Sequence, residues 1–381
     1  MAQTLASGRP AVRRQWHGAD IRLADVVGQI NRLQAEIVRL ESSEGEHIQP
    51  RSKVVDIVAV AATPEEAERA AGITGKLADR HPCRAVIVLD EPGRGESRVD
   101  AAVTVAVSSQ IDCDMCQYEE VFLRCRGPVA EHIPALVESL LVSDVPGFLW
   151  WTGSPPIATQ RYRDALDVAD VAIVDSARFD DPAQQFCDLV GLAGSLPGAV
   201  FGDFAWSRIH PWRELVAQFF NPADRRGLLD EIRSVEIDHS GSNRVAAALF
   251  AGWLATALGW QRAGVRADRD GVKIEYRGRH TVTLRPAGRS TQIIEGDLVA
   301  IAIGVDGGRS SASLTAERAA DRAAEVSLRG VLDRRPIARR VWPMAPAPDE
   351  SLLGDQLVNA RSERLFWPAA VEADKILRRA G

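Results

Sequence analysis

Short apolar runs alternate with helix-like segments through the first half of the chain, and this rhythm constrains its fold more than any other feature. Residues 54–61, VVDIVAVA, have the composition of a buried strand. Thr63 and Pro64 follow at once, as is typical of a helix N-cap and the first helical position. Further strands are predicted at residues 85–89, 102–107, 120–125 and 171–176, with helices at 129–142 and about 159–168. Helices between short strands indicate a layered α/β sheet of five or six strands.

The second half has a different composition and predicts an α+β domain. Helices are expected at about residues 207–220, 223–234 and 242–261, and again at 315–332. Residues 272–276 and 280–286 predict a hairpin, and residues 298–304 predict another strand. The fold class is therefore α/β, with an N-terminal layered α/β domain followed by an α+β C-terminal domain.

We divide the chain into four parts. They are a flexible arm (1–19), an α/β domain with a leading helix (20–200), the α+β domain of helices, antiparallel strands and a helix (201–341), and a Pro-rich linker with a C-terminal helix (342–381). The leading helix carries apolar residues at alternating steps of three and four, from Leu23 to Leu40. We expect it to pack against its own domain; pairing with another subunit is the alternative.

Charge and composition exclude several classes of protein. A net charge of -6 argues against a nucleic-acid partner. No apolar run is long enough for a membrane span, and the N-terminus lacks the apolar core of a secretory signal, so we expect a cytoplasmic protein without a membrane partner. Five scattered cysteines do not suggest a disulfide framework.

Two adjacent tryptophans, Trp150 and Trp151, end a short apolar run. Asp144 and Pro146 precede them. Pro155 and Pro156 follow them. Because successive strand residues point to opposite faces, one indole can enter the core while the other forms a binding platform. Alternatively, helices cover both faces and both rings are core.

A second tryptophan-rich run opens the helical part of the second half. It contains Trp206, Arg208, Trp212 and Arg213, and both arginines are close enough in sequence to lie over indole faces. The run is either an anchor that packs helices or a surface that binds a partner protein.

Motifs of catalysis are missing from the sequence. There is no glycine fingerprint for a dinucleotide, no Walker lysine, no nucleophile elbow and no pair of histidines at metal-ligand spacing. We therefore predict no catalytic residue, no metal and no cofactor.

Two weaker features remain. Cys113 and Cys116 form a C-x-x-C pair, expected in a loop between strands, and could make a regulatory disulfide, although two inert thiols are the simpler interpretation. Four arginines, Arg334, Arg335, Arg339 and Arg340, could bind a phosphate-bearing metabolite or an acidic protein surface, or simply be solvated.

Several motifs in order carry a family resemblance. DVPGFLWWTGSPP, VDSARF, FAWSRIHPWRELVAQFF and AALFAGWLATALGW, within residues 50–335, resemble the OpcA family, which is named for assembly and activation of glucose-6-phosphate dehydrogenase and is found in actinobacteria and cyanobacteria. The resemblance adds Asp175, Ser176 and Trp253 to the residues expected to be structural or interfacial. It implies a non-catalytic regulator that binds the dehydrogenase and promotes its active oligomer. The alternative is an enzyme or sensor that binds a sugar phosphate through the four arginines.

Overall fold

The computed structural model describes residues 12–43, 55–78, 81–93, 95–110, 113–288, 292–308, 311–319 and 322–380, without the side chains of 41–43, 108–110 and 113–117. The chain divides into two compact units. The first comprises Met1–Val174, Gly198–Gly202 and Asp349–Arg361, and the second comprises Asp175–Pro197, Asp203–Pro348 and Ser362–Gly381. The boundary expected near residue 200 thus falls in a stretch where the chain passes between the units more than once.

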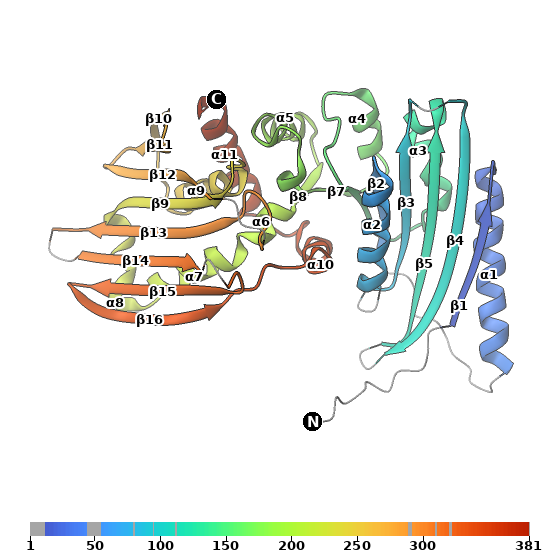
Figure 1. Ribbon diagram of the computed structural model, residues 1–381, viewed down its shortest axis with the longest axis horizontal. Coiled ribbons are helices and arrows are strands. Elements are labelled where there is room, and N and C mark those ends of the chain that lie inside the picture. The colour runs from blue at the N-terminus through green and yellow to red at the C-terminus, as the bar shows by residue number, and fades with distance from the viewer. Residues whose placement is uncertain are drawn as a thin grey trace. The chain divides into compact units, whose positions relative to one another are not determined.

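An eight-stranded sheet is the centre of the first unit (Figure 1). Its order is β1 (Val12–Gly18), β4 (Arg98–Gln110), β5 (Cys113–Arg126), β3 (Cys83–Glu91), β2 (Val55–Ala61), β6 (Gly147–Trp151), β7 (Val171–Val174) and β8 (Val200–Asp203). The run β5, β3, β2, β6, β7 is parallel, whereas β4 and β1 pair antiparallel at one edge. The expected α/β layering is confirmed, with more strands than predicted.

Residues 12–18 of the expected flexible arm belong to this sheet. They form β1, which pairs with residues 101–107 of β4, so the prediction of a loose segment up to residue 19 is wrong for this part. Alternate residues of β1 are half-buried, because one face of the edge strand rests on the unit.

Helices of the first unit follow the sequence patterns closely. They are α1 (Leu23–Ser43), α2 (Pro64–Leu77), α3 (Ile133–Val137), α4 (Gln160–Leu166) and α10 (Asp349–Asn359). The apolar stripe of α1 is buried within the unit from Val26 to Ile37. Thr63 caps α2 as predicted by accepting a bond from the Glu66 amide. The helix expected at 129–142 is instead α3 between two 3₁₀ turns, in a segment interrupted by Pro134.

The second unit contains another eight-stranded sheet (Figure 1). Its order is β10 (Arg262–Asp268), β11 (Gly271–Tyr276), β12 (His280–Ala287), β9 (Ile232–Ser240), β13 (Leu298–Asp306), β14 (Ser311–Arg318), β15 (Glu325–Leu332) and β16 (Arg335–Pro343). All pairs are antiparallel except β12 with β9. The predicted hairpin is β11–β12, with Gly278 at φ +86° in its turn.

One helix expected in this unit is replaced by strands, and another is shorter than expected, since it is helical only at Ala223–Arg226 (α8) and in a 3₁₀ turn at Leu229–Glu231. Residues 315–332 form parts of β14 and β15, and the end of the helix expected at 223–234 is the start of β9. In β14, Ala312, Leu314 and Ala316 are buried while the residues between them are exposed or half-exposed. This period of two is that of a strand. Among the charges at helical spacing, Glu317 and Arg329 are exposed, whereas Arg318 is buried.

Helices of the second unit are α5 (Pro182–Ser195), α6 (Phe204–Arg208), α7 (His210–Phe220), α8 (Ala223–Arg226), α9 (Val245–Ala257) and α11 (Phe366–Ala380). Helix α9 is buried almost throughout, and a Cβ at Gly252 would come within 2.3 Å of the Ala369 carbonyl oxygen on α11. Close packing therefore requires glycine there. The single C-terminal helix expected after the linker is in fact two helices, α10 in the first unit and α11 in the second.

Over the part of the chain that the structure describes, no helix has the length and apolar character to span a bilayer. Within the same residues, no cluster of histidine, cysteine and carboxylate side chains is arranged to hold a metal ion.

Candidate functional site

The tryptophan strand lies at the point of the first sheet where a ligand would be expected. β2 has β3 on one side and β6 on the other, all parallel, so the order of the strands reverses between β2 and β6. In open α/β sheets, ligands bind at the carboxyl ends of the strands next to such a switch point. Here these ends lead into the β2–α2 turn and into residues 152–156 after β6.

Glu66 occupies this switch point. Its carboxylate accepts bonds from the Ala62 amide at 2.9 Å and from the Thr152 hydroxyl at 3.4 Å. A Cβ on Gly153 would lie only 2.3 Å from Glu66 Oε1, so the glycine is what admits the carboxylate. Dinucleotides place their pyrophosphate at this turn, on the helix N-terminus. In this chain the first turn of α2 carries two acids, Glu65 and Glu66, which repel a phosphate.

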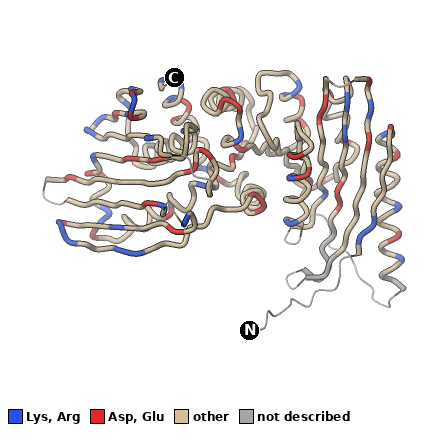
Figure 2. The backbone as a smooth tube through the Cα atoms, in the orientation of Figure 1, with Lys and Arg blue, Asp and Glu red and all other residues tan. Residues whose placement is uncertain are grey.

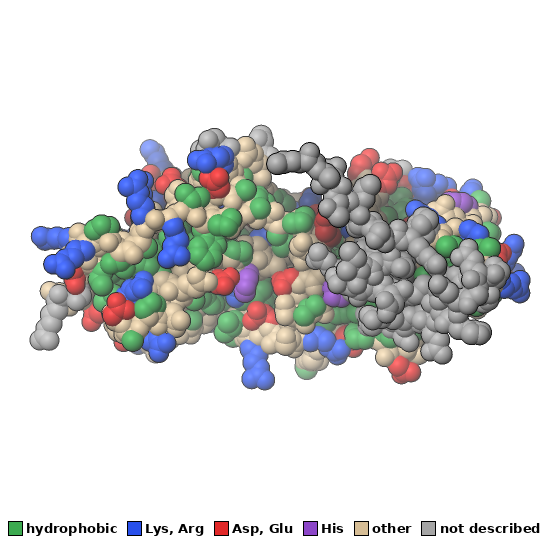
Figure 3. Space-filling model, turned by 90° about the horizontal axis from the view of Figure 1, so that it is seen from below, with side chains coloured by type: hydrophobic (Ala, Val, Ile, Leu, Met, Phe, Trp, Pro, Cys, Tyr) green, Lys and Arg blue, Asp and Glu red, His purple; other side chains and the backbone are tan. Residues whose placement is uncertain are grey.

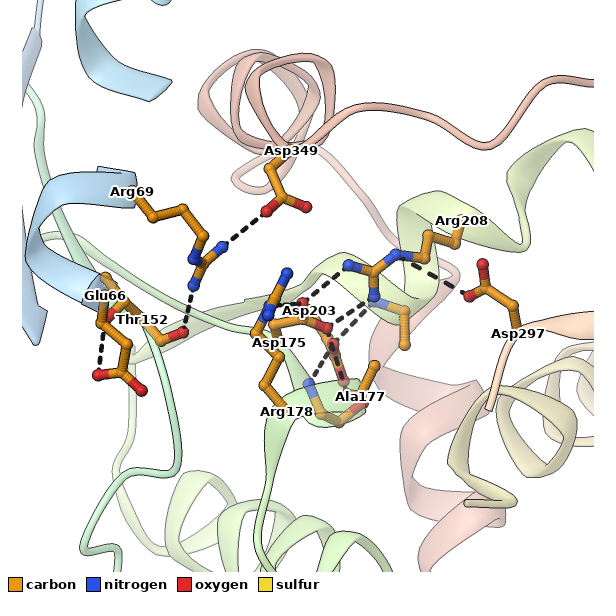
Figure 4. Close-up of polar contacts among 12 residues, drawn as sticks. Glu66, Arg69, Thr152, Asp175, Ala177, Arg178, Asp203, Arg208, Asp297 and Asp349 are labelled. Atoms are coloured by element: carbon orange, nitrogen blue, oxygen red, sulfur yellow. Dashed lines mark hydrogen bonds and ion pairs between the residues drawn. The ribbon is translucent and has the colours of Figure 1, made fainter. Parts of the chain in front are cut away.

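Arg69 neutralises part of this charge and links three segments of the first unit. Its guanidinium donates to the Thr152 carbonyl at 2.6 Å and pairs with Asp349 at 2.6 Å, at the start of α10 (Figure 4). It also lies 5.5 Å from the centre of the Trp150 ring. The switch point is therefore occupied by side chains of the chain itself, which bond to one another and to the backbone.

Both adjacent tryptophans are core residues. Trp150 is 0% exposed and Trp151 is 4% exposed, and Trp151 packs edge-on against Tyr162 of α4 with ring centres 5.3 Å apart. The interpretation of one ring as an exposed binding platform does not fit this burial, because helices cover both faces of the parallel sheet.

The prolines and Asp144 shape the loops around this strand. Asp144 is exposed and adopts φ +68° in the turn before β6, and the Pro146 carbonyl accepts from the Asp56 amide. Pro155 is buried and Pro156 is half-buried after the strand. These positions orient the chain around β6.

A second polar cluster lies in the second unit, around Asp175. Arg208 makes a two-pronged ion pair with this carboxylate at 2.7 and 2.8 Å, and both side chains are buried (Figure 4). Burial opposes ionisation of Asp175, but Arg208 and then Arg178 outweigh it and hold its pKa below the usual value. The predicted proximity of Arg208 to an indole is replaced by this ion pair.

Two further carboxylates, Asp203 and Asp297, belong to this cluster, and their pKa values are raised where that of Asp175 is lowered. Asp203 accepts from the amides of Ser176 at 3.1 Å and Ala205 at 2.9 Å, and burial raises its pKa to about 6. Burial likewise raises the pKa of Asp297, 3.9 Å from Arg208, to about 6. Asp175 and Asp203 are each 1% exposed and Asp297 keeps 13% of its side chain exposed, so the cluster is largely internal and can rigidify the unit.

The second tryptophan run is also internal. Trp206 is 3% exposed and Trp212 is 1% exposed. Arg213 lies 3.6 Å from the Trp206 ring centre, as expected for a cation–π contact, and Arg318 lies 5.6 Å from that of Trp212. Trp253 is half-exposed beside Phe250. The geometry is that of an anchor for the helices of the unit.

The remaining predicted residues are less constrained. The backbone of Cys113 and Cys116 is the start of β5 and not a loop, while their side chains lie outside the described residues. Arg334, Arg335, Arg339 and Arg340 are exposed, in the β15–β16 turn and along the edge strand β16, where Figure 2 shows basic residues gathered.

Sequence reasoning did not single out Glu66, Arg69, Asp203 or Asp297. One available signal was the pair of acids in the first turn after the first parallel strand, where a nucleotide-binding protein would carry glycines. For Arg69 and Asp297 no local pattern exists, because their partners are distant in sequence, whereas Asp203 is the N-cap of α6 and accepts from the nearby Ala205 amide.

Solved structures resemble the chain in fold. The match to an NAD binding oxidoreductase from Klebsiella pneumoniae has a TM-score of 0.50 and 10% identity, covering 86% of this chain and 96% of that one. KijD10, a 3-ketoreductase from Actinomadura kijaniata, gives a TM-score of 0.48 and 12% identity over 86% and 96% of the two chains. At such identity the first likeness concerns the Rossmann-like fold alone.

Curated relatives are found in cyanobacteria. An OxPP cycle protein OpcA of Synechocystis is 31% identical over 192 residues, which is 50% of this chain and 40% of that protein. The protein of the same name in Nostoc punctiforme is 30% identical over 210 residues, 54% and 44% of the two lengths. The matched region thus spans less than half of each relative.

Two family models match consecutive parts of the chain. The glucose-6-phosphate dehydrogenase subunit N-terminal domain matches residues 74–190, and the C-terminal domain of the same description matches residues 199–370. Together they cover well over half of the sequence, including β6, the Asp175 cluster and the second sheet, whereas β1, β2, Glu66 and Arg69 precede the first matched region. The chain belongs to the OpcA family.

Proposed function

We propose that this chain is a non-catalytic, cytoplasmic regulator that binds glucose-6-phosphate dehydrogenase and promotes assembly of its active oligomer. Membership of a family described as subunits of that enzyme supports the choice of partner.

The filled switch point is the observation that carries the non-catalytic part of the proposal. Glu66 lies where the fold would place a pyrophosphate, and Arg69 is bonded to Thr152 and Asp349. A ligand would have to displace a carboxylate and break an ion pair between residues that are largely buried. A Rossmann-like unit with this site filled retains the scaffold of a dehydrogenase without the cradle for its cofactor.

The mechanism requires unequal affinity for two states of the enzyme. A regulator shifts an oligomerisation or conformational equilibrium only by the ratio of its affinities for the states involved. We therefore propose that this chain binds the active oligomer of the dehydrogenase more tightly than the inactive form. Equal affinity for both would rule out the mechanism.

The test uses the dehydrogenase from the same organism and the full chain. Initial rates are measured across glucose 6-phosphate concentrations with and without the chain, and the mixture is analysed by size-exclusion chromatography with light scattering. We expect a shared peak together with a lower KM or a higher kcat. Unchanged rates and separate elution, under both reducing and oxidising conditions, would contradict the proposal.

The exposed arginines supply a sharper variant for the same assay. Reversing Arg334 and Arg335 to glutamate should weaken binding if they meet an acidic surface of the enzyme. Arg22→Glu, whose side chain is 86% exposed in the first unit, is the matched control for a change of charge.

A sugar-phosphate sensor is the competing function, and geometry disfavours it. Arg339 and Arg340 are consecutive strand residues, so they point to opposite faces and do not converge on one anion. Calorimetric titration of the isolated chain with glucose 6-phosphate separates the two proposals, because only a sensor gives a binding isotherm.

A further inference from the structure

The second sheet has one buried face and one open face. On β13 and β14 the residues Ile301, Ile303, Leu314 and Ala316 are buried, whereas Ser313 and Glu317, which alternate with the buried residues of β14, are exposed. The buried face packs against helices, as where Phe219 of α7 meets Gly330 of β15. The other face is exposed or half-exposed across the strands from β12 to β16.

One row of residues crosses the whole open face in register. Thr283 pairs with Glu236, Glu236 with Ala302, and so on across neighbouring strands. The complete row from β12 to β16 is Thr283, Glu236, Ala302, Thr315, Arg329 and Arg339. The acidic Glu236 therefore lies on β9, next to the central pair β13–β14 on one side. The basic Arg329 lies on β15, next to that pair on the other side.

This pattern is complementary to itself. If a second sheet is turned by 180° about an axis parallel to the strands, between β13 and β14, then β9 of one copy faces β15 of the other. Glu236 then faces Arg329, and this occurs twice by symmetry. Within a single copy these residues are three strands, about 14 Å, apart and cannot pair.

Other rows agree with the same axis. Asp238 and Ser327 face each other in this arrangement, as do Glu317 and Ala300, because they lie in one register row. No like charges meet in these rows. An axis perpendicular to the strands would instead set each strand against itself, with glutamate facing glutamate, which costs binding energy.

The exposure of the charged side chains and the area of this face are both sufficient for a partner to bind. Glu236 keeps 45% of its side chain exposed although it pairs with Arg285 at 2.9 Å, and among the described residues none forms an ion pair with Arg329. Six facing strands of eight or nine residues span about 29 by 27 Å, or about 800 Å² per copy. This is the area that one partner buries in a stable interface of standard size. Figure 3, seen from below, shows basic and hydrophobic side chains side by side toward the β16 edge.

We propose that the open face of the second sheet binds a second copy of this chain, sheet against sheet, about a two-fold axis parallel to the strands. The surface of a second copy supplies the complementary charges at the required spacing. This inference is independent of the proposed regulatory function, since it concerns the chain alone.

The test is a charge swap followed by sedimentation of the purified full-length chain. Glu236→Arg alone and Arg329→Glu alone should each raise the dimer dissociation constant at least about tenfold, because each sets like charges together at two symmetric positions. The double variant should return to within about threefold of the wild type, because the pair is re-formed between copies. Arg22→Glu, in the first unit, should leave the constant unchanged.

A steric variant checks the position of the axis. Ala302 is half-buried at the centre of the open face, so arginine there is tolerated by one copy but separates two. Ala302→Arg should be monomeric with an unchanged melting temperature. A wild-type chain that is monomeric up to about 100 µM, or a dimer that survives Ala302→Arg, would overturn the proposal. If the wild type is monomeric and the same variants lose the dehydrogenase instead, the face belongs to that enzyme and the second copy is excluded.

Discussion

Replacing Asp203 by asparagine should change how the stability of the chain depends on pH. Asp203 is 1% exposed, and burial raises its pKa from 3.8 to about 6. A raised pKa means that the folded state holds a proton that the unfolded state releases more readily. The neutral carboxyl therefore stabilises the fold at low pH, and this contribution is lost as the pH rises from about 4 to about 6.

The magnitude follows from the size of the pKa change. A difference of about two units corresponds to about 3 kcal/mol of unfolding free energy. Asparagine keeps an acceptor oxygen for the amides of Ser176 and Ala205 but carries no charge at any pH. The unfolding free energy of the variant, relative to that of the wild type, should therefore rise by about 3 kcal/mol between pH 4 and 6. Above pH 6 this difference should stay constant.

Urea unfolding at pH values from 4 to 8 measures this difference. Asp224→Asn, on a side chain that is 68% exposed, controls for the amide substitution itself. A difference between Asp203→Asn and wild type that is constant over the whole pH range would refute the reasoning, because it would show that Asp203 does not hold its proton in the fold.

Four further substitutions test the packing of the two clusters by urea unfolding. Trp150→Ala should lower the unfolding free energy by about 3–5 kcal/mol, because it empties a fully buried site; a loss below about 1 kcal/mol would contradict the core assignment. Arg208→Met should cost about 3–5 kcal/mol because it removes the two-pronged partner of the buried Asp175 and leaves only Arg178, at 3.2 Å, and a neutral effect would argue against the pair. Gly153→Ala should cost about 1 kcal/mol or less, since the added Cβ lies 2.3 Å from Glu66 Oε1, the end of a half-exposed side chain that can move away. Glu66→Ala in the same chain should recover part of that loss, whereas purely additive effects would show that the two residues are not in contact.

Local sequence patterns predicted the elements whose stability is local. Thr63 and Pro64 predicted the start of α2, and the Thr63 side chain does cap this helix. The β11–β12 hairpin was predicted from its turn, where Gly278 takes a positive φ that other residues resist. The motifs from Asp144 to Trp253 identified the family.

Patterns failed where two periods fit the same residues. Residues 315–332 carry charges at helical spacing and apolar residues at a spacing of two, and only pairing with β13 and β16 selects the strands. The start of β9 was not predicted either, because β9 is a central strand whose neighbours, β12 and β13, come later in the chain. Sheet pairing is non-local, so a short window cannot reveal it.

The candidate site was predicted in part. The segment around Trp150 was singled out, and it does lie at the switch point of the first sheet, but its tryptophans are core residues. The residues that fill this point come from places far apart in the chain, with Arg69 and Asp349 separated by 280 positions.

By itself, therefore, the sequence determined the α/β class, the local caps and turns, and the family, because these depend on neighbouring residues and on motifs in order. Only the tertiary structure decided that the switch point is filled by Glu66 and Arg69, that Asp175 and Arg208 form a buried pair, and that one face of the second sheet is open. Each of these depends on contacts between distant segments, whose burial and charge are set only when the sheets have formed.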